Sequence, residues 1–270
     1  MKLSLVISVE DTAFDAVAMR GRWEESIRMA AALGYDGVEI AVRDPARIDA
    51  ATLDRSVRDA GVAVAAIGTG QAYLHDGLSL TSDDAGIRRR AIERMAAHIR
   101  FAIPFGAAVI VGLIRGRLVG DRATTDQRLT AALKELIQHA APRDVRLLLE
   151  PINRYETDYL TTVEEALEVI GRIDSPLLGV LADTFHMNIE EVSMEQALRR
   201  AGSRLGHVHV ADSNRRAPGW GHLDFAGILV VLKEVGYRGY LSAEILPLPD
   251  PAGAARQAVQ HLRQLREASH

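Results

Sequence analysis

The chain contains no cysteine, has no excess of basic residues and has no apolar run long enough to span a membrane. The absence of cysteine excludes disulfide bonds, thiolate metal ligands and a thiol nucleophile. Lys and Arg number 32 against 36 Asp and Glu, so the formal net charge is −4 and a nucleic-acid partner is not expected. The apolar run at the N-terminus is too short for a signal-peptide core, and we expect a cytoplasmic protein without a membrane partner.

Short runs of Val, Ile, Leu and Ala alternate with longer amphipathic segments along the whole chain. Such continuous apolar runs are typical of parallel strands covered by helices on both sides. About eight strand–helix units of roughly 30 residues each predict a (β/α)8 TIM barrel that spans residues 1–270 as one domain. A doubly wound open sheet is the alternative, but no GxGxxG follows the first apolar run.

The expected strands are Lys2–Ser8, Gly37–Val42, Val62–Gly68, Ala107–Ile114, Val145–Ile152, Leu177–Thr184, Leu205–Asp212 and Gly239–Leu246. The expected helices are Trp23–Leu33, Ile48–Ala60, Ile87–Ala102, Asp126–Ala140, Val163–Ile173, Met194–Arg200, Phe225–Val235 and Ala252–Glu267. Thr162 is expected to cap the fifth of these helices, and Gly34 and Gly61 to end the first two.

Four of the expected strands end on a side chain that can bind a metal ion. Glu150, Asp183, His209 and Glu244 follow one another at intervals of 33, 26 and 35 residues, about one strand–helix unit each. In such barrels the C-terminal ends of the strands meet at one mouth. Three carboxylates gathered there would repel each other without a cation, so the spacing predicts a divalent-metal site. Mn²⁺ is the first expectation, followed by Co²⁺ or Mg²⁺, with Zn²⁺ a weaker candidate.

The stretches LLLEPINRYET, GVLADTFHMNIEE, HVHVADSNRRAPGWGHLDF and LSAEILP resemble the xylose-isomerase-like sugar isomerase and epimerase barrels, most closely the D-tagatose 3-epimerase group. The resemblance implies that the four strand-end residues bind the metal. It also implies that Glu156, His186 and Arg215 contact the substrate. A narrower likeness to the 5-keto-L-gluconate epimerase branch, which interconverts 5-keto-L-gluconate and D-tagaturonate, rests on MKLSLVIS, EIAVRDP, AIGTGQAYLHDGLSL and ADSNRRAPGWGHLDF.

Epimerisation beside a carbonyl needs an electrophile for the enediolate charge and an acid and a base on opposite sides of the carbon. A divalent ion chelated by the substrate can supply the first requirement. Glu150 and Glu244 come from strands three apart around the barrel, so we expect these two to exchange the proton. An aldose–ketose isomerase on a sugar or sugar phosphate would use the same residues, and the sequence separates the two reactions poorly.

Other polar residues near the predicted mouth carry weaker expectations. Arg115 and Arg117 follow the fourth strand, where they could anchor the carboxylate of a keto sugar acid. We assign His207 to the strand face opposite His209, beneath a helix, and leave it out of the site. In GTGQAY the small residues indicate a close-packed rim loop, without a phosphate-binding spacing.

Two distant alternatives remain. An AP-endonuclease-like phosphodiesterase would need a multi-zinc cluster with histidines on the third and fourth strands. These strands end in AAIGTG and VGLIRG, which contain no histidine, so this activity is not expected. A non-catalytic barrel that binds a sugar acid is the other, and the intact pair of glutamates argues against it. We expect a small sugar or sugar acid as the binding partner, and a homo-oligomer, dimer or tetramer, is possible for this family.

Overall fold

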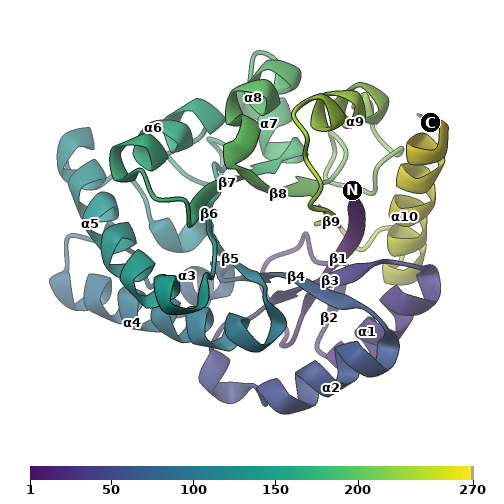
Figure 1. Cartoon of the computed structure of the whole chain (residues 1–270), viewed down its shortest axis with the longest axis horizontal. Helices are drawn as coiled ribbons and strands as arrows, with labels where there is room; N and C mark the ends of the chain where they lie inside the picture. Colours follow the sequence, from purple (N-terminus) through teal and green to yellow (C-terminus); the bar gives the residue numbers. More distant parts are fainter. Residues whose placement is uncertain (269–270) are drawn as a thin grey trace.

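The computed structural model describes residues 1–268, whose strands close into a parallel barrel (Figure 1). Within these residues the strand order is β2-β1-β3-β4-β5-β6-β7-β8-β9, and β1 also pairs with β9, which closes the barrel. The (β/α)8 TIM barrel predicted from the sequence is confirmed, and the open sheet is excluded. The strands are β1 (Lys2–Ser8), β2 (Met19–Arg20), β3 (Gly37–Ala41), β4 (Ala63–Gly68), β5 (Ala108–Val111), β6 (Leu147–Leu149), β7 (Leu178–Asp183), β8 (Leu205–Val210) and β9 (Tyr240–Ala243).

The helices form a ring around the barrel (Figure 1). Because helices cover one side of each strand and barrel side chains fill the other, strands such as β6 are buried along their whole length. The helices are α1 (Trp23–Leu33), α2 (Ala50–Ala60), α3 (Gly70–Asp76), α4 (Ala85–Ala102), α5 (Arg122–Ala140), α6 (Val163–Ile173), α7 (Thr184–Glu190), α8 (Met194–Ala201), α9 (Phe225–Glu234) and α10 (Pro251–Ala268). None of them, over the residues described, is long and apolar enough to cross a membrane.

The capping residues predicted from the sequence lie at the observed helix ends. Thr162 caps α6 in a full capping box, in which its side chain accepts from the backbone N–H of Glu165 and the Glu165 side chain accepts in return. Gly34 and Gly61 end α1 and α2 with φ of 90° and 71°, a left-handed conformation that glycine adopts without steric cost.

Two short helices at the mouth of the barrel were not predicted. The segment expected to be a rim loop after β4 forms α3, and α7 begins directly after β7. Asp183 itself caps α7, since its carboxylate accepts hydrogen bonds from the backbone N–H groups of Phe185 and His186. Asp183 is therefore both the last residue of β7 and the N-cap of α7, and the two capping hydrogen bonds fix the orientation of its carboxylate.

Candidate active site

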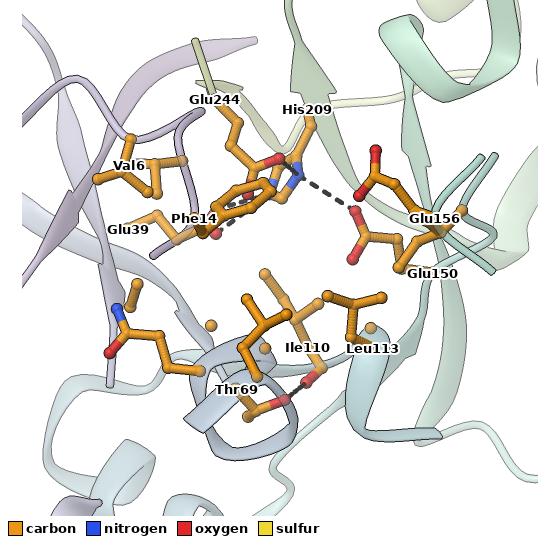
Figure 2. Close-up of a pocket in the computed structure, with 18 of the residues that line it drawn as sticks. Val6, Phe14, Glu39, Thr69, Ile110, Leu113, Glu150, Glu156, His209 and Glu244 are labelled. Atoms are coloured by element: carbon orange, nitrogen blue, oxygen red, sulfur yellow. Dashed lines mark hydrogen bonds and ion pairs between the residues drawn. The ribbon is translucent and has the colours of Figure 1, made fainter. Parts of the chain in front are cut away.

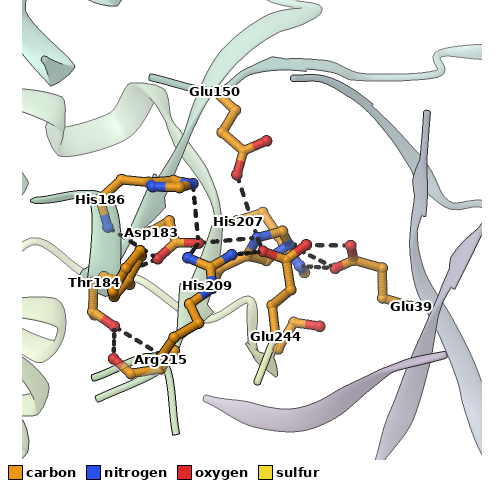
Figure 3. Close-up of polar contacts among 12 residues, drawn as sticks. Glu39, Glu150, Asp183, Thr184, His186, His207, His209, Arg215 and Glu244 are labelled. Carbon is orange, nitrogen blue, oxygen red and sulfur yellow. Dashed lines mark hydrogen bonds and ion pairs between the residues drawn. The ribbon is translucent and has the colours of Figure 1, made fainter. Parts of the chain in front are cut away.

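The residues predicted from the strand ends converge at the C-terminal mouth of the barrel. One donor atom from each of Glu150, Asp183, His209 and Glu244 lies within 4.8 Å of the others. Glu150 follows β6, Asp183 ends β7, His209 lies in β8 and Glu244 follows β9. Neighbouring parallel strands thus deliver the four side chains to one point (Figure 3).

The ring nitrogen Nδ1 of His209 tests whether a cation fits this quartet. It lies 3.4 Å from Glu150 Oε1, 3.7 Å from Asp183 Oδ2 and 3.5 Å from Glu244 Oε2. It is buried and makes no hydrogen bond within the described residues. A nitrogen lone pair that faces three carboxylate oxygens is unfavourable unless positive charge lies between them. Three carboxylates and one imidazole are donors suited to Mn²⁺, Co²⁺ or Mg²⁺, so the residues present fit a divalent cation.

The carboxylates of the quartet differ in their electrostatic surroundings. Burial raises the pKa of Glu150 to about 7, and the carboxylates of Glu244 and Asp183 add to this effect. Burial also opposes ionisation of Asp183, but Arg215 and His186 hold the pKa of that carboxyl well below its usual range. In the surroundings shown, Glu150 is thus the carboxyl group that more readily holds a proton.

Glu39, from β3, is a site residue that the sequence reasoning missed. Its carboxylate is 1% exposed and accepts hydrogen bonds from Nε2 of both His207 and His209 (Figure 3). The prediction for His207 is wrong, because residues two apart on a strand point to the same face. The signal for Glu39 was available, since a glutamate inside the apolar run GVEIAV is costly to bury without partners.

His186 and Glu156 both line the cavity, as expected for substrate contacts, and Asn153 connects them. The amide nitrogen of Asn153 lies 2.7 Å from His186 Nδ1 and 2.9 Å from Glu156 Oε1. Since an amide nitrogen donates, Nδ1 of His186 is the acceptor and Nε2 carries the hydrogen. Burial lowers the pKa of His186 to about 3, so this imidazole is neutral and can donate from Nε2.

Arg215 is held against the carboxylates of the quartet. One terminal nitrogen lies 3.0 Å from Asp183 Oδ2, and the other bonds Glu244 Oε2. The guanidinium also lies over the ring of Phe185, 4.7 Å from its centroid, which adds a cation–π contact. Arg215 therefore compensates part of the negative charge of the site, and its contact with a substrate stays a prediction.

The cavity beside the quartet is partly open to solvent, and about 610 Å³ of atom-free space, solvent included, lies within it. Val6, Phe14, Ile110 and Leu113 are apolar residues that surround the cavity together with Glu150 and Glu244 (Figure 2). Among the described residues that line the cavity, none is a lysine or an arginine. The lining offers apolar contact and hydrogen bonds, but no cation for an anionic group.

The structure corrects the expectation for Arg115. Its side chain is fully buried and donates to the carbonyl oxygens of Gly112, Tyr159 and Leu160. It connects the segment after β5 to the loop after β6 and does not line the cavity, because its two terminal nitrogens point to these backbone carbonyls. Arg117 is exposed on the rim, where it bonds the Tyr73 hydroxyl and the Glu156 carbonyl oxygen, and its role as an anchor remains untested.

Replacing Arg115 by methionine is expected to lower the free energy of unfolding by about 1–3 kcal/mol, because buried carbonyl oxygens lose their charged donor. Urea unfolding followed by circular dichroism measures this. Arg117→Met is the matched control: it removes an exposed arginine two residues away and is expected to change stability by less than about 0.5 kcal/mol. Equal effects of the two substitutions would contradict the structural role of Arg115.

Comparison with known proteins identifies the family. The sequence profile of the family described as xylose isomerase-like TIM barrel matches residues 27–265. The chain belongs to this family. The resemblance noted from the sequence motifs is thereby confirmed at the level of the family and agrees with the D-tagatose 3-epimerase group.

Several relatives in the family are named as epimerases. The chain is 33% identical over 241 residues to L-ribulose 3-epimerase of Methylomonas sp. (strain DH-1), covering 85% of this chain and 82% of that protein. Over 147 residues it is 37% identical to 3-dehydro-D-guloside 4-epimerase of Escherichia coli (strain K12), covering 54% of this chain and 55% of that protein. A crystal structure of D-allulose 3-epimerase from Methylomonas sp. in complex with D-allulose has a TM-score of 0.82 and 28% identity, with 97% of each chain covered.

Proposed function

We propose that this protein is a divalent-metal-dependent ketose epimerase that inverts the carbon beside the carbonyl group. The observation that carries the proposal is the convergence of Glu150, Asp183, His209 and Glu244 within 4.8 Å next to a cavity lined by hydrogen-bonding and apolar side chains. The names of the relatives, which are epimerases of ketoses and of a keto-glycoside, support the same reaction class.

In the proposed reaction Glu150 and Glu244 exchange the proton. The two carboxylates come from β6 and β9, three strands apart, and both line the cavity, so they can flank a sugar carbon from two sides (Figure 2). One carboxylate removes the proton and the other returns a proton to the opposite face. A bound divalent cation would supply electrostatic stabilisation of the negative charge that develops on the sugar oxygens.

Neighbouring side chains orient the sugar and exclude water. Neutral His186 donates from Nε2, and the Glu156 carboxylate accepts, so the pair can bond sugar hydroxyl groups. Phe14 and Leu113, apolar residues of the lining, can cover the reacting carbon and lower the local dielectric.

The lining of the cavity favours a neutral ketose over a keto sugar acid. No lysine or arginine belongs to the described lining, and Arg115, the expected anchor, is buried elsewhere. A substrate carboxylate would enter a cavity already lined by Glu39, Glu150, Glu156 and Glu244. The prediction of 5-keto-L-gluconate or D-tagaturonate therefore depends on Arg215, whose guanidinium already bonds Asp183 and Glu244, or on Arg117 turning inward, and a neutral ketose is the first candidate.

The rival activities make different demands on the site. Aldose–ketose isomerisation uses the same acid–base pair but moves the proton between the first two carbons. The AP-endonuclease-like reaction would need histidines at the ends of β4 and β5, and the described residues there, Gly68 and Gly112, provide none. The crystal structure of an AP endonuclease of family 2 from Brucella melitensis has the same fold at 19% sequence identity. This similarity shows a common fold and carries no argument about the reaction.

Reaction in heavy water tests the proposal. Purified protein with Mn²⁺ is incubated with neutral ketohexoses and, in parallel, with keto-uronates, and the products are analysed by NMR. We expect deuterium at C3 of the ketose, or at the carbon beside the carbonyl in a keto acid, with faster turnover of the neutral sugars. Deuterium at C1 or C2 alone would identify an isomerase, and higher kcat/KM for keto-uronates would restore the sugar-acid prediction.

The identity of the metal, the oligomeric state and the cytoplasmic location stay predictions. Elemental analysis of the purified protein and light scattering at working concentration measure the first two.

A further inference from the structure

Glu39 does not belong to the quartet, but its carboxylate makes the closest polar contacts of His209, the histidine of the quartet. Its Oε1 and Oε2 lie 3.1 Å and 3.0 Å from His209 Nε2, and Oε2 also lies 2.9 Å from His207 Nε2. All three side chains are at most 2% exposed. The carboxylate reaches His209 from β3, three strands away around the barrel, and meets both imidazoles in the interior (Figure 3).

These contacts decide which nitrogen of His209 carries the hydrogen. A carboxylate only accepts hydrogen bonds, so Nε2 at 3.0 Å from Glu39 is the donor. When a cation takes the place of a proton on Nδ1, the imidazole is neutral with its one N–H on Nε2, and the lone pair of His209 lies on Nδ1. Nδ1 is the atom that faces Glu150, Asp183 and Glu244 and has no hydrogen-bond partner among the described residues.

We propose that Glu39 is a positioning residue, which holds His209 in the tautomer and ring orientation that present the Nδ1 lone pair to the cation. His207 is the second donor to Glu39 and keeps the carboxylate from rotating away from His209. The inference rests on the cation site of the proposed function, but it is independent of the reaction catalysed there.

A second cation held by Glu39, His207 and His209 is the competing interpretation, since their donor atoms also lie within 4.8 Å of one another. It would require His209 to coordinate through both nitrogens and lose its last N–H hydrogen. A neutral imidazole offers a single lone pair, so the hydrogen-bonded arrangement is the less costly one.

The test is the affinity of the Glu39→Gln variant for Mn²⁺, measured by titration calorimetry on the metal-depleted protein. Loss of an outer carboxylate that orients a ligating histidine weakens metal binding by about 10–100-fold, and we expect a rise of this size in the Kd. One ion should bind per chain in the parent protein. A Kd within about 3-fold of the parent value, or two ions per chain, would overturn the proposal.

Tyr35→Phe separates positioning from general destabilisation. It removes the buried hydrogen bond from the Tyr35 hydroxyl to the Ala255 carbonyl oxygen, between the loop after α1 and α10. We expect it to lower stability while leaving the Kd for Mn²⁺ unchanged. If Tyr35→Phe weakens Mn²⁺ binding as much as Glu39→Gln does, the effect is one of stability and the positioning role is wrong.

A spectroscopic measurement reports the tautomer directly. In the Mg²⁺-loaded protein with ¹⁵N-labelled histidine, His209 is expected to carry its hydrogen on Nε2, and Glu39→Gln is expected to reduce that population. An unchanged His209 spectrum would contradict the proposal. Should Glu39→Gln not fold, Glu39→Asp keeps the charge but retracts the acceptor, and an unchanged Kd in that variant would equally overturn it.

Discussion

Replacement of Glu150 or Glu244 by glutamine is expected to lower kcat by about 10²–10⁴-fold, the usual contribution of a positioned acid or base. Glutamine keeps the size of the side chain and one oxygen that can face the cation, but it cannot accept the proton in transit. Both carboxylates line the cavity, so both substitutions act where the sugar binds. Steady-state assays at saturating Mn²⁺ measure the loss.

Isotope exchange separates loss of proton transfer from loss of the cation. A variant that lacks one of the two glutamates retains a base on one side of the sugar. We expect it to exchange the proton of one epimer with heavy water while forming almost none of the other epimer. Calorimetric titration of each variant with Mn²⁺ provides the control for ligation. Full turnover by either variant would remove that glutamate from the reaction.

Removal of divalent cations is expected to abolish turnover and to lower the melting temperature. Without a cation, Nδ1 of His209 lies 3.4–3.7 Å from three carboxylates whose charges raise the pKa of His209, and Arg215 offsets part of the remaining negative charge. A ligand that binds only the folded state stabilises it by about 2.7 kcal/mol at a concentration of 100 times its Kd. For a protein of this size we expect a shift of several degrees, and Mn²⁺ should restore both properties.

Differential scanning calorimetry with and without a chelator measures this shift. Asp183→Asn is the matched control: it removes one ligand charge from the quartet and should abolish most of the stabilisation by Mn²⁺. If the chelated protein keeps its activity and its melting temperature, the quartet is not a metal site, and the four side chains are a network of buried ion pairs.

The alternation of buried runs and amphipathic segments was sufficient to predict the barrel. Strands such as Leu147–Leu149 are apolar throughout because both their sides are covered, and this pattern is a property of the sequence itself. The spacing of Glu150, Asp183, His209 and Glu244 was equally informative. In a parallel barrel all strands end at one rim, so a side chain repeated at the period of the fold must reach one place.

Contacts between distant strands were decided only by the tertiary structure. His207 and His209 lie on the same strand face, and their spacing of two residues was enough to predict this. Their partner Glu39 lies 168 and 170 residues away in sequence. No local rule connects β3 with β8, because barrel closure alone brings these strands around a common interior.

For Arg115, the sequence predicted the position of the backbone, and only the tertiary structure decided the direction of the side chain. Its place after the fourth predicted strand was correct, and the side chain nevertheless turns into the protein, where three carbonyl oxygens accept its hydrogen bonds. The sequence determines which backbone segment reaches the rim, since that depends on local periodicity. The direction of a long side chain depends on which unpaired acceptors the neighbouring loop presents, and that is known only once the loop is packed.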